Sequence, residues 1–150
     1  DHRDLHSFPT RRSSDLIASI PMLMDTGGNA GSQSSTLVIR GIAVGELKLR
    51  DALTVLIKEL RVSLLVGGGL AIVNFGYKYA MSGDLLLSII VGISLFGTVI
   101  FAQTVGGMLP LLAKAVGFDP ALMASPIVTT IVDAGSLTLY FAVASRVMGI

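Results

Sequence analysis

A long stretch without a charged side chain, Leu85 to Leu109, constrains this sequence more than any other feature. A helix of about twenty apolar residues can cross a lipid bilayer, and this stretch has that length. The whole chain agrees, since 52% of its residues are hydrophobic and only 14% are charged, with a mean hydropathy of +0.77. In soluble domains about a quarter of the residues are charged, so the composition indicates a membrane protein.

Three further stretches have spanning length. The four expected transmembrane helices are Leu16 to Ile39, Val62 to Ala80, Leu85 to Leu109 and Ala121 to Met148. Between the first two, Gly41 to Arg61 alternates leucines with charged residues, which is typical of an amphipathic helix at the membrane interface. We therefore predict an all-α, polytopic membrane helix bundle with about four transmembrane helices and one interfacial amphipathic helix.

Basic residues gather in one connection of the expected bundle. The segment from Arg40 to Arg61 holds five of them, whereas Lys78 and Lys114 stand alone in the next two connections. By the positive-inside rule, the Arg40 to Arg61 connection is predicted to be cytoplasmic, in a multi-pass protein of the cell (inner) membrane. The net charge of +1 offers no general attraction to nucleic acid, so the expected surroundings are a lipid bilayer.

The first sixteen residues differ from the rest of the chain. Asp1 to Leu16 is polar and has no sustained apolar pattern, so residues 1–16 are predicted to be a non-native or disordered leader. Residues 17–150 are predicted to form a transmembrane pore domain that lacks a preceding helix. The chain has no cysteine, so any bound metal must use oxygen ligands or histidine.

A polar stripe interrupts the first expected span. Its members, spaced by four, four and three residues so that they face one way on a helix, are Asp25, Asn29, Gln33 and Thr36. Gly27 and Gly31 predict the close approach of another helix. The Gly27-Gly28 pair after Pro21 also allows a second interpretation, in which the helix loosens and frees backbone carbonyls.

Asp133 lies about one third into the last span, and no lysine or arginine lies at comparable depth in another span. A buried carboxylate in a membrane needs a partner, so a bound cation is the most economical counter-charge for Asp133, and for Asp25 as well. The alternative is a protonated Asp133 that hydrogen-bonds to Asn29, Asn74 or Gln103. Oxygen ligands favour hard cations, and few carboxylates along a wide polar path favour Mg²⁺.

Several separate motifs occur in the order known from the MgtE family of magnesium transporters. They are Pro21 with GGNAGSQ at 27–33, Arg40-Gly41 with Gly45-Glu46, GMLPLL at 107–112, Asp119-Pro120-Ala121, and PIVTTIVD at 126–133. On these motifs, residues 17 to 150 resemble the transmembrane domain of that family. The resemblance implies five transmembrane helices per subunit, of which the first is absent here together with the soluble magnesium-sensing domains.

The same resemblance implies a homodimer with a pore along the subunit interface. It implies that Asp133 binds hydrated Mg²⁺ and that Asn29 lines the path. Thr129, one turn before Asp133, and Asp25, one turn before Asn29, complete the predicted metal site. Mg²⁺ is expected as the transported and bound ion, with no catalytic and no other cofactor-binding residues.

The predicted function is transmembrane transport of Mg²⁺ by channel-like permeation of the hydrated ion through a dimeric pore. A sodium- or proton-coupled divalent cation exchanger on the same scaffold is the alternative. An intramembrane aspartyl dyad of Asp25 and Asp133 would make the chain an enzyme. Neither residue has a GxGD-like context, so we predict that the chain is not an enzyme. A structural membrane subunit without an ion path is the third alternative.

Overall fold

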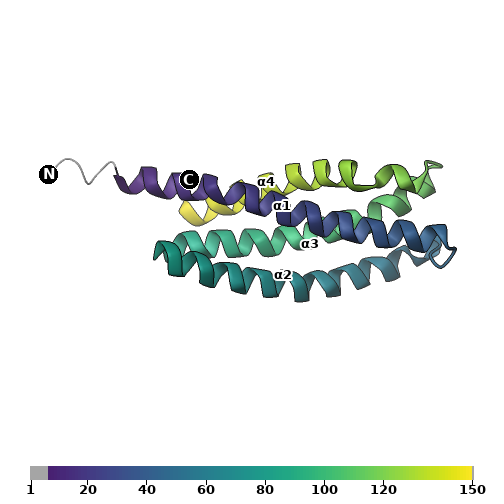
Figure 1. Cartoon of the computed structure of the whole chain (residues 1–150), viewed down its shortest axis with the longest axis horizontal. Helices are drawn as coiled ribbons and strands as arrows, with labels where there is room; N and C mark the ends of the chain where they lie inside the picture. Colours follow the sequence, from purple (N-terminus) through teal and green to yellow (C-terminus); the bar gives the residue numbers. More distant parts are fainter. Residues whose placement is uncertain (1–6, 150) are drawn as a thin grey trace.

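The computed structural model of the chain describes residues 7–149, and every regular element in that range is a helix. The long helices lie side by side in an elongated bundle (Figure 1). They are α1 (Ser7–Ala43), α2 (Ala52–Ser82), α3 (Leu85–Ala115) and α4 (Ser125–Met148). Two short 3-10 helices, η1 (Leu49–Asp51) and η2 (Pro120–Met123), precede α2 and α4. The predicted all-α helix bundle is confirmed.

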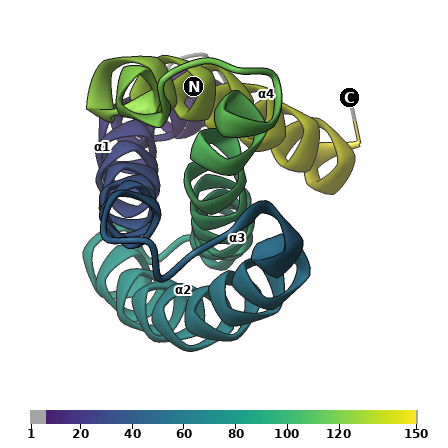
Figure 2. The ribbon, with the colours of Figure 1, turned by 90° about the vertical axis from the view of Figure 1, so that its right-hand side faces the viewer.

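Helix α3 is the centre of the bundle. It packs against α1, α2 and α4, whereas α2 packs mainly on α3. Viewed along the bundle, α2 and α4 lie on opposite sides of α3, and α1 faces α3 from a third side (Figure 2). The uncharged run of α3 before Lys114 is the reason, since Ile90, Val91, Leu95 and Val99 can all be fully enclosed. In lipid, close van der Waals packing rather than the hydrophobic effect holds such side chains together.

Turn-forming residues separate the helices. Gly83 ends α2 at a φ of 67°, a left-handed conformation that glycine adopts without strain. The Asp84 side chain then accepts a hydrogen bond from the Leu87 N–H at 3.1 Å and so caps α3. Asp119 accepts from the Ala121 N–H at 2.9 Å at the start of η2. These residues make the α2–α3 and α3–α4 connections short and well defined.

Helix α2 differs from the expected interfacial helix followed by a separate span. Residues 44–48 form a turn, η1 follows, and α2 runs from Ala52 through Arg61 to Ser82 without a break. No proline or glycine lies between Lys58 and Val62, so nothing interrupts the helical hydrogen bonds there. The second half of the charged amphipathic stretch, residues 52–61, is therefore the first part of α2 rather than an element of its own.

Helix α1 begins earlier than the sequence pattern predicts. Residues 7–16, expected to belong to a leader, are helical and continue directly into the first span. The Tyr140 hydroxyl of α4 donates a hydrogen bond to the Leu16 carbonyl at 2.8 Å. The helix thus extends into the segment expected to be a non-native or disordered leader, an expectation that stays a prediction, and residues 1–6 of that segment lie outside the described residues.

Two helices in the described range, α3 and α4, are long and apolar enough to cross a membrane by length and composition. Their most apolar windows have mean hydropathies of 2.5 and 1.6. The other two expected spans are also helical, but α1 carries the polar stripe and α2 begins with charged residues. Neither α1 nor α2 is among the candidate spans identified by length and composition.

Candidate metal centre

The polar stripe of α1 lies on the side of the helix that faces away from the core. Asp25, Asn29, Gln33 and Thr36 are exposed in the single chain. The buried residues of α1, such as Leu23, alternate with them at helical spacing and face α3 and α4. The stripe predicted from the sequence is therefore present as one continuous face.

The glycines of α1 serve close packing. A Cβ added to Gly27 would lie 2.7 Å from Thr98 Cγ2, and one added to Gly31 would lie 3.0 Å from Val128 Cγ1. The first distance is too short for a real side chain and the second would force Val128 to shift, so these glycines let α3 and α4 approach α1 closely. The backbone of α1 remains helical through Gly27 and Gly28, and the expected loosening there is not found.

On α4, Thr129 and Asp133 occupy successive turns of the face that meets α1. Both side chains are half-buried. The Thr129 hydroxyl donates to the carbonyl of Ser125 at 2.9 Å, so its oxygen lone pairs remain available to accept. Thr129 can therefore act toward a ligand as an acceptor, in the same sense as a carboxylate.

All four residues of the predicted metal site line one cavity between α1 and α4. This cavity, called the metal centre below, has a volume of about 180 Å³, which is room for several water molecules. Its lining residues are Met24, Asp25, Gly28, Asn29, Thr129 and Asp133. A Cβ on Gly28 would lie 3.3 Å from Thr129 Cγ2 and 3.7 Å from Asp133 Oδ1, so the glycine keeps the cavity open beside the carboxylate.

Neither carboxylate of the metal centre has a protein partner among residues 13–149, whose side chains the structure describes. Asp25 and Asp133 make no ion pair and accept no hydrogen bond from these residues. The alternative hydrogen bonds from Asp133 to Asn29, Asn74 or Gln103 are thus not formed within the described chain. Two unpaired carboxylates, one amide and one hydroxyl are a donor set suited to a hard cation.

The same residues do not form a complete inner coordination shell. Within the described range, no group of three or more His, Asp or Glu side chains lies close enough to hold a metal ion together. A site with only two carboxylates from one chain suits an ion that keeps most of its water, as Mg²⁺ tends to do. The arrangement can attract and orient such an ion without stripping it.

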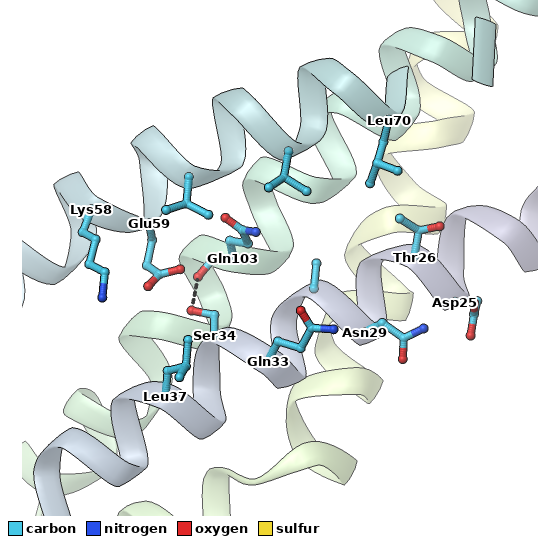
Figure 3. Close-up of a pocket in the computed structure, with 13 residues that line it drawn as sticks. Asp25, Thr26, Asn29, Gln33, Ser34, Leu37, Lys58, Glu59, Leu70 and Gln103 are labelled. Carbon is cyan, nitrogen blue, oxygen red and sulfur yellow. Dashed lines mark hydrogen bonds between the residues drawn. The ribbon is translucent and has the colours of Figure 1, made fainter. Parts of the chain in front are cut away.

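A larger cavity adjoins the metal centre and was not predicted from the sequence. It lies among α1, α2 and α3, has a volume of about 450 Å³, and is called the chamber below (Figure 3). The chamber and the metal centre share Asp25 and Asn29. Its other polar residues include Ser34, Glu59 and Gln103.

Sequence patterns assigned Glu59 to the charged face of an interfacial helix, whereas the structure buries it to 6% exposure. One signal was available, because Val55, Glu59, Ser63 and Gly67 recur every four residues and form the buried stripe of α2. Three of these residues, Val55, Ser63 and Gly67, are small or apolar enough for a core face. Periodicity therefore could have placed Glu59 inward once α2 was recognised as continuous.

Most of this sequence aligns with known proteins. The profile of the MgtE family, described as a divalent cation transporter, matches residues 20–143. The "Magnesium transporter MgtE" of Thermus thermophilus is 46% identical over 125 residues, covering 83% of this chain and 28% of that protein. The proteins of the same name from Bacillus subtilis and Enterococcus faecalis are 31% identical over 126 residues and 28% identical over 136 residues.

These alignments cover 84% and 91% of this chain and 28% and 30% of the two proteins. The chain thus spans less than a third of the length of the curated relatives that it matches. The matched region contains the metal centre, the chamber, all of α2 and α3, and most of α1 and α4. On the breadth of the family match, this chain belongs to the MgtE family of divalent cation transporters.

Proposed function

We propose that the chain contributes the ion path of a magnesium transporter, in which hydrated Mg²⁺ permeates past the metal centre. The observation that carries this proposal is the meeting of Asp25, Asn29, Thr129 and Asp133 at one cavity, with no lysine or arginine from residues 13–149 paired to either carboxylate. The names of the three relatives support Mg²⁺ as the ion.

Each residue of the metal centre has a distinct task in this proposal. Asp133 provides the charge that makes a cation stable at membrane depth, where an uncompensated carboxylate costs about 3 kcal/mol on insertion scales. Asn29 and Thr129 accept hydrogen bonds from the waters of the ion. Asp25 adds a second negative charge one turn from Asn29, and so strengthens attraction without direct coordination.

The pore forms between two copies of the chain in a homodimer. The exposed stripe of Asp25, Asn29, Gln33 and Thr36 supports this arrangement, because such side chains are not stable facing lipid. A second copy related by a two-fold axis would oppose the stripe with an identical one and enclose a polar path. The half-open metal centre of one chain would then face its equivalent.

The protein lies in the cell (inner) membrane with the segment from Arg40 to Arg61 on the cytoplasmic side. This orientation rests on the concentration of basic residues there. Transport rather than catalysis is proposed, since the family and its relatives are described as transporters and none of these descriptions names a reaction.

The test is Mg²⁺ flux into liposomes that contain the protein and a trapped fluorescent indicator. Asp133→Asn keeps the size of the side chain and removes its charge, and we expect flux to fall about a hundredfold. Glu46→Gln is the matched control, because Glu46 is exposed in the turn after α1 and lines neither cavity. Normal flux in Asp133→Asn would favour a structural subunit and contradict the proposal.

The same assay separates a channel from a coupled exchanger. Channel-like permeation predicts a rate that depends on the Mg²⁺ gradient and membrane potential alone. A rate that rises when a sodium or proton gradient is imposed at constant membrane potential would instead establish the exchanger on this scaffold.

A further inference from the structure

Beyond the metal centre, the chamber holds a second carboxylate with unusual surroundings. Glu59 is 6% exposed and makes no ion pair or hydrogen bond with residues 13–149. Its side chain is folded against α3, where a Cβ on Gly107 would lie 2.7 Å from Glu59 Cγ. The glycine thus leaves the space that Glu59 occupies.

The buried side-chain amide of Gln103 lies beside this carboxylate, and its oxygen accepts no hydrogen bond from the described residues. Gln103 is 7% exposed, lines the chamber, and its side-chain Oε1 has no hydrogen-bond partner among the described residues. Ser34 donates its hydroxyl hydrogen to the backbone carbonyl of Gln103 at 3.2 Å, so it does not serve either acceptor. Figure 3 shows Glu59, Gln103 and Ser34 together at one end of the chamber.

Gln103 Oε1 is a buried acceptor without a donor, and the Glu59 carboxylate beside it, on a side chain that is 6% exposed, has no partner among residues 13–149; both favour a species that carries positive charge or hydrogens. Leaving such groups unsatisfied is costly, and most of all for a carboxylate. Lys58 lines the same chamber, but it forms no ion pair with Glu59 within 4.0 Å. A hydrated cation would satisfy both groups at once. Its charge would compensate the Glu59 carboxylate, and its water molecules would donate hydrogen bonds to the Gln103 side-chain oxygen.

The charge balance of the two joined cavities fits a divalent ion. Asp25, Glu59 and Asp133 are negative and Lys58 is positive, so the lining carries an excess of two negative charges. The shared residues Asp25 and Asn29 make the cavities neighbours along α1. An ion could therefore pass between the metal centre and the chamber beside the side-chain oxygens of Asp25 and Asn29.

We propose that the chamber is a second binding position for a hydrated divalent cation, held by Glu59 and Gln103 on the side of the metal centre that lies toward the turn of residues 44–48. This position deepens the proposed transport function and rests on it. A permeating ion would occupy the metal centre and the chamber in succession, and multiple positions of moderate affinity allow an ion both to enter and to leave.

The experiment measures binding directly, with Mn²⁺ as the probe, by the electron paramagnetic resonance signal of free Mn²⁺ over the purified protein in detergent. Mn²⁺ is a hard divalent cation that favours the same oxygen ligands as Mg²⁺. The background variant is Asp133→Asn, which weakens the metal centre and leaves the chamber unchanged. In this background we expect a remaining Mn²⁺ site.

Adding Glu59→Gln to Asp133→Asn should raise the dissociation constant of the remaining site about tenfold or more, because the charged ligand is lost. Adding Glu46→Gln instead removes one exposed carboxylate of equal charge and should leave it unchanged. Gln103→Leu provides a second variant of the chamber and should weaken the site about threefold. Helicity by circular dichroism and the gel-filtration profile confirm that each variant is folded.

The outcomes separate this proposal from the one on which it rests. If Glu59→Gln behaves like Glu46→Gln, the chamber holds water only and the proposal is overturned. If Asp133→Asn alone abolishes Mn²⁺ binding, the chamber position is again overturned while the metal centre stands. If Asp133→Asn changes neither flux nor Mn²⁺ affinity and Glu59→Gln lowers both, the metal centre fails and the chamber stands.

Discussion

The metal centre and the chamber are neighbouring cavities that differ in how deeply their polar side chains are buried. The metal centre lies between α1 and α4, and its residues are exposed or half-buried in one chain. The chamber lies among α1, α2 and α3, and its key acceptors, Glu59 and Gln103, are nine-tenths buried. The metal centre is therefore open along the surface of one chain, whereas the chamber combines buried acceptors at one end with exposed lining residues elsewhere.

This difference indicates how a membrane protein can hold polar groups in two ways. A polar face that is exposed in one chain can line a water-filled path where two chains meet. A polar group buried inside one chain must instead be satisfied by neighbours or by a bound species. Asn29 and Asp25 line both cavities, so substitutions can show whether the two act together.

The largest expected effect comes from filling the metal centre with Gly28→Leu. The new side chain would enter between Thr129 and Asp133, where a Cβ already lies 3.3 Å from Thr129 Cγ2. Displacing the ion would leave the carboxylate uncompensated, and we expect Mg²⁺ flux to fall about a hundredfold in the liposome assay. Gly69→Leu is the control, because no atom lies within 4 Å of a Cβ there. Equal flux in both variants would contradict a path through the metal centre.

Filling the chamber with Gly107→Leu should have the next largest effect. A Cβ at this position would lie 2.7 Å from Glu59 Cγ and 3.1 Å from Ser34 Oγ, so Glu59 must move. We expect flux to fall about tenfold and stability to fall by about 1–3 kcal/mol, the usual cost of overpacking. Flux and thermal unfolding by circular dichroism measure these effects, with Gly76→Leu as the control in open surroundings. Lost stability with normal flux would limit the chamber to a structural role.

Asn29→Leu tests the connection between the two cavities. Loss of an acceptor for the waters of the ion should lower flux about fivefold, since one such hydrogen bond contributes about 1 kcal/mol. The oligomeric state, measured by light scattering after gel filtration, should not change. A variant that loses the dimer but retains normal flux per assembled dimer would assign Asn29 to packing and break the link between the cavities.

The smallest effect is expected from Ser34→Ala, which removes the hydrogen bond to the Gln103 carbonyl at one end of the chamber. The backbone carbonyl loses a single donor, so stability should fall by about 1 kcal/mol and flux should stay within about twofold. Thr138→Ala is the comparison, since its hydroxyl bonds only within α4 and is exposed. A large loss of flux in Ser34→Ala alone would mean that Ser34 itself meets the ion.

Much of the architecture follows from local sequence. The uncharged run of α3, the four-residue spacing of Asp25, Asn29 and Gln33, and the depth of Asp133 are properties of single segments. Helical periodicity converts each into a face or a position along a helix. For this reason the sequence predicted the all-α bundle and the polar stripe of α1. It also predicted which four residues are candidates for the metal centre.

The tertiary structure alone decided which faces meet. Periodicity does not state that α4 crosses α1 at Gly28, bringing Thr129 and Asp133 against Asp25 and Asn29, because that contact depends on how closely two particular helices approach. Periodicity also could not predict that Glu59 is buried, because the sequence pattern divided α2 into two elements at Arg61. A charged side chain beside a membrane segment is most stable in water unless the fold supplies a pocket for it. Segment chemistry is local, whereas burial and partnership are set by the packing of the whole bundle.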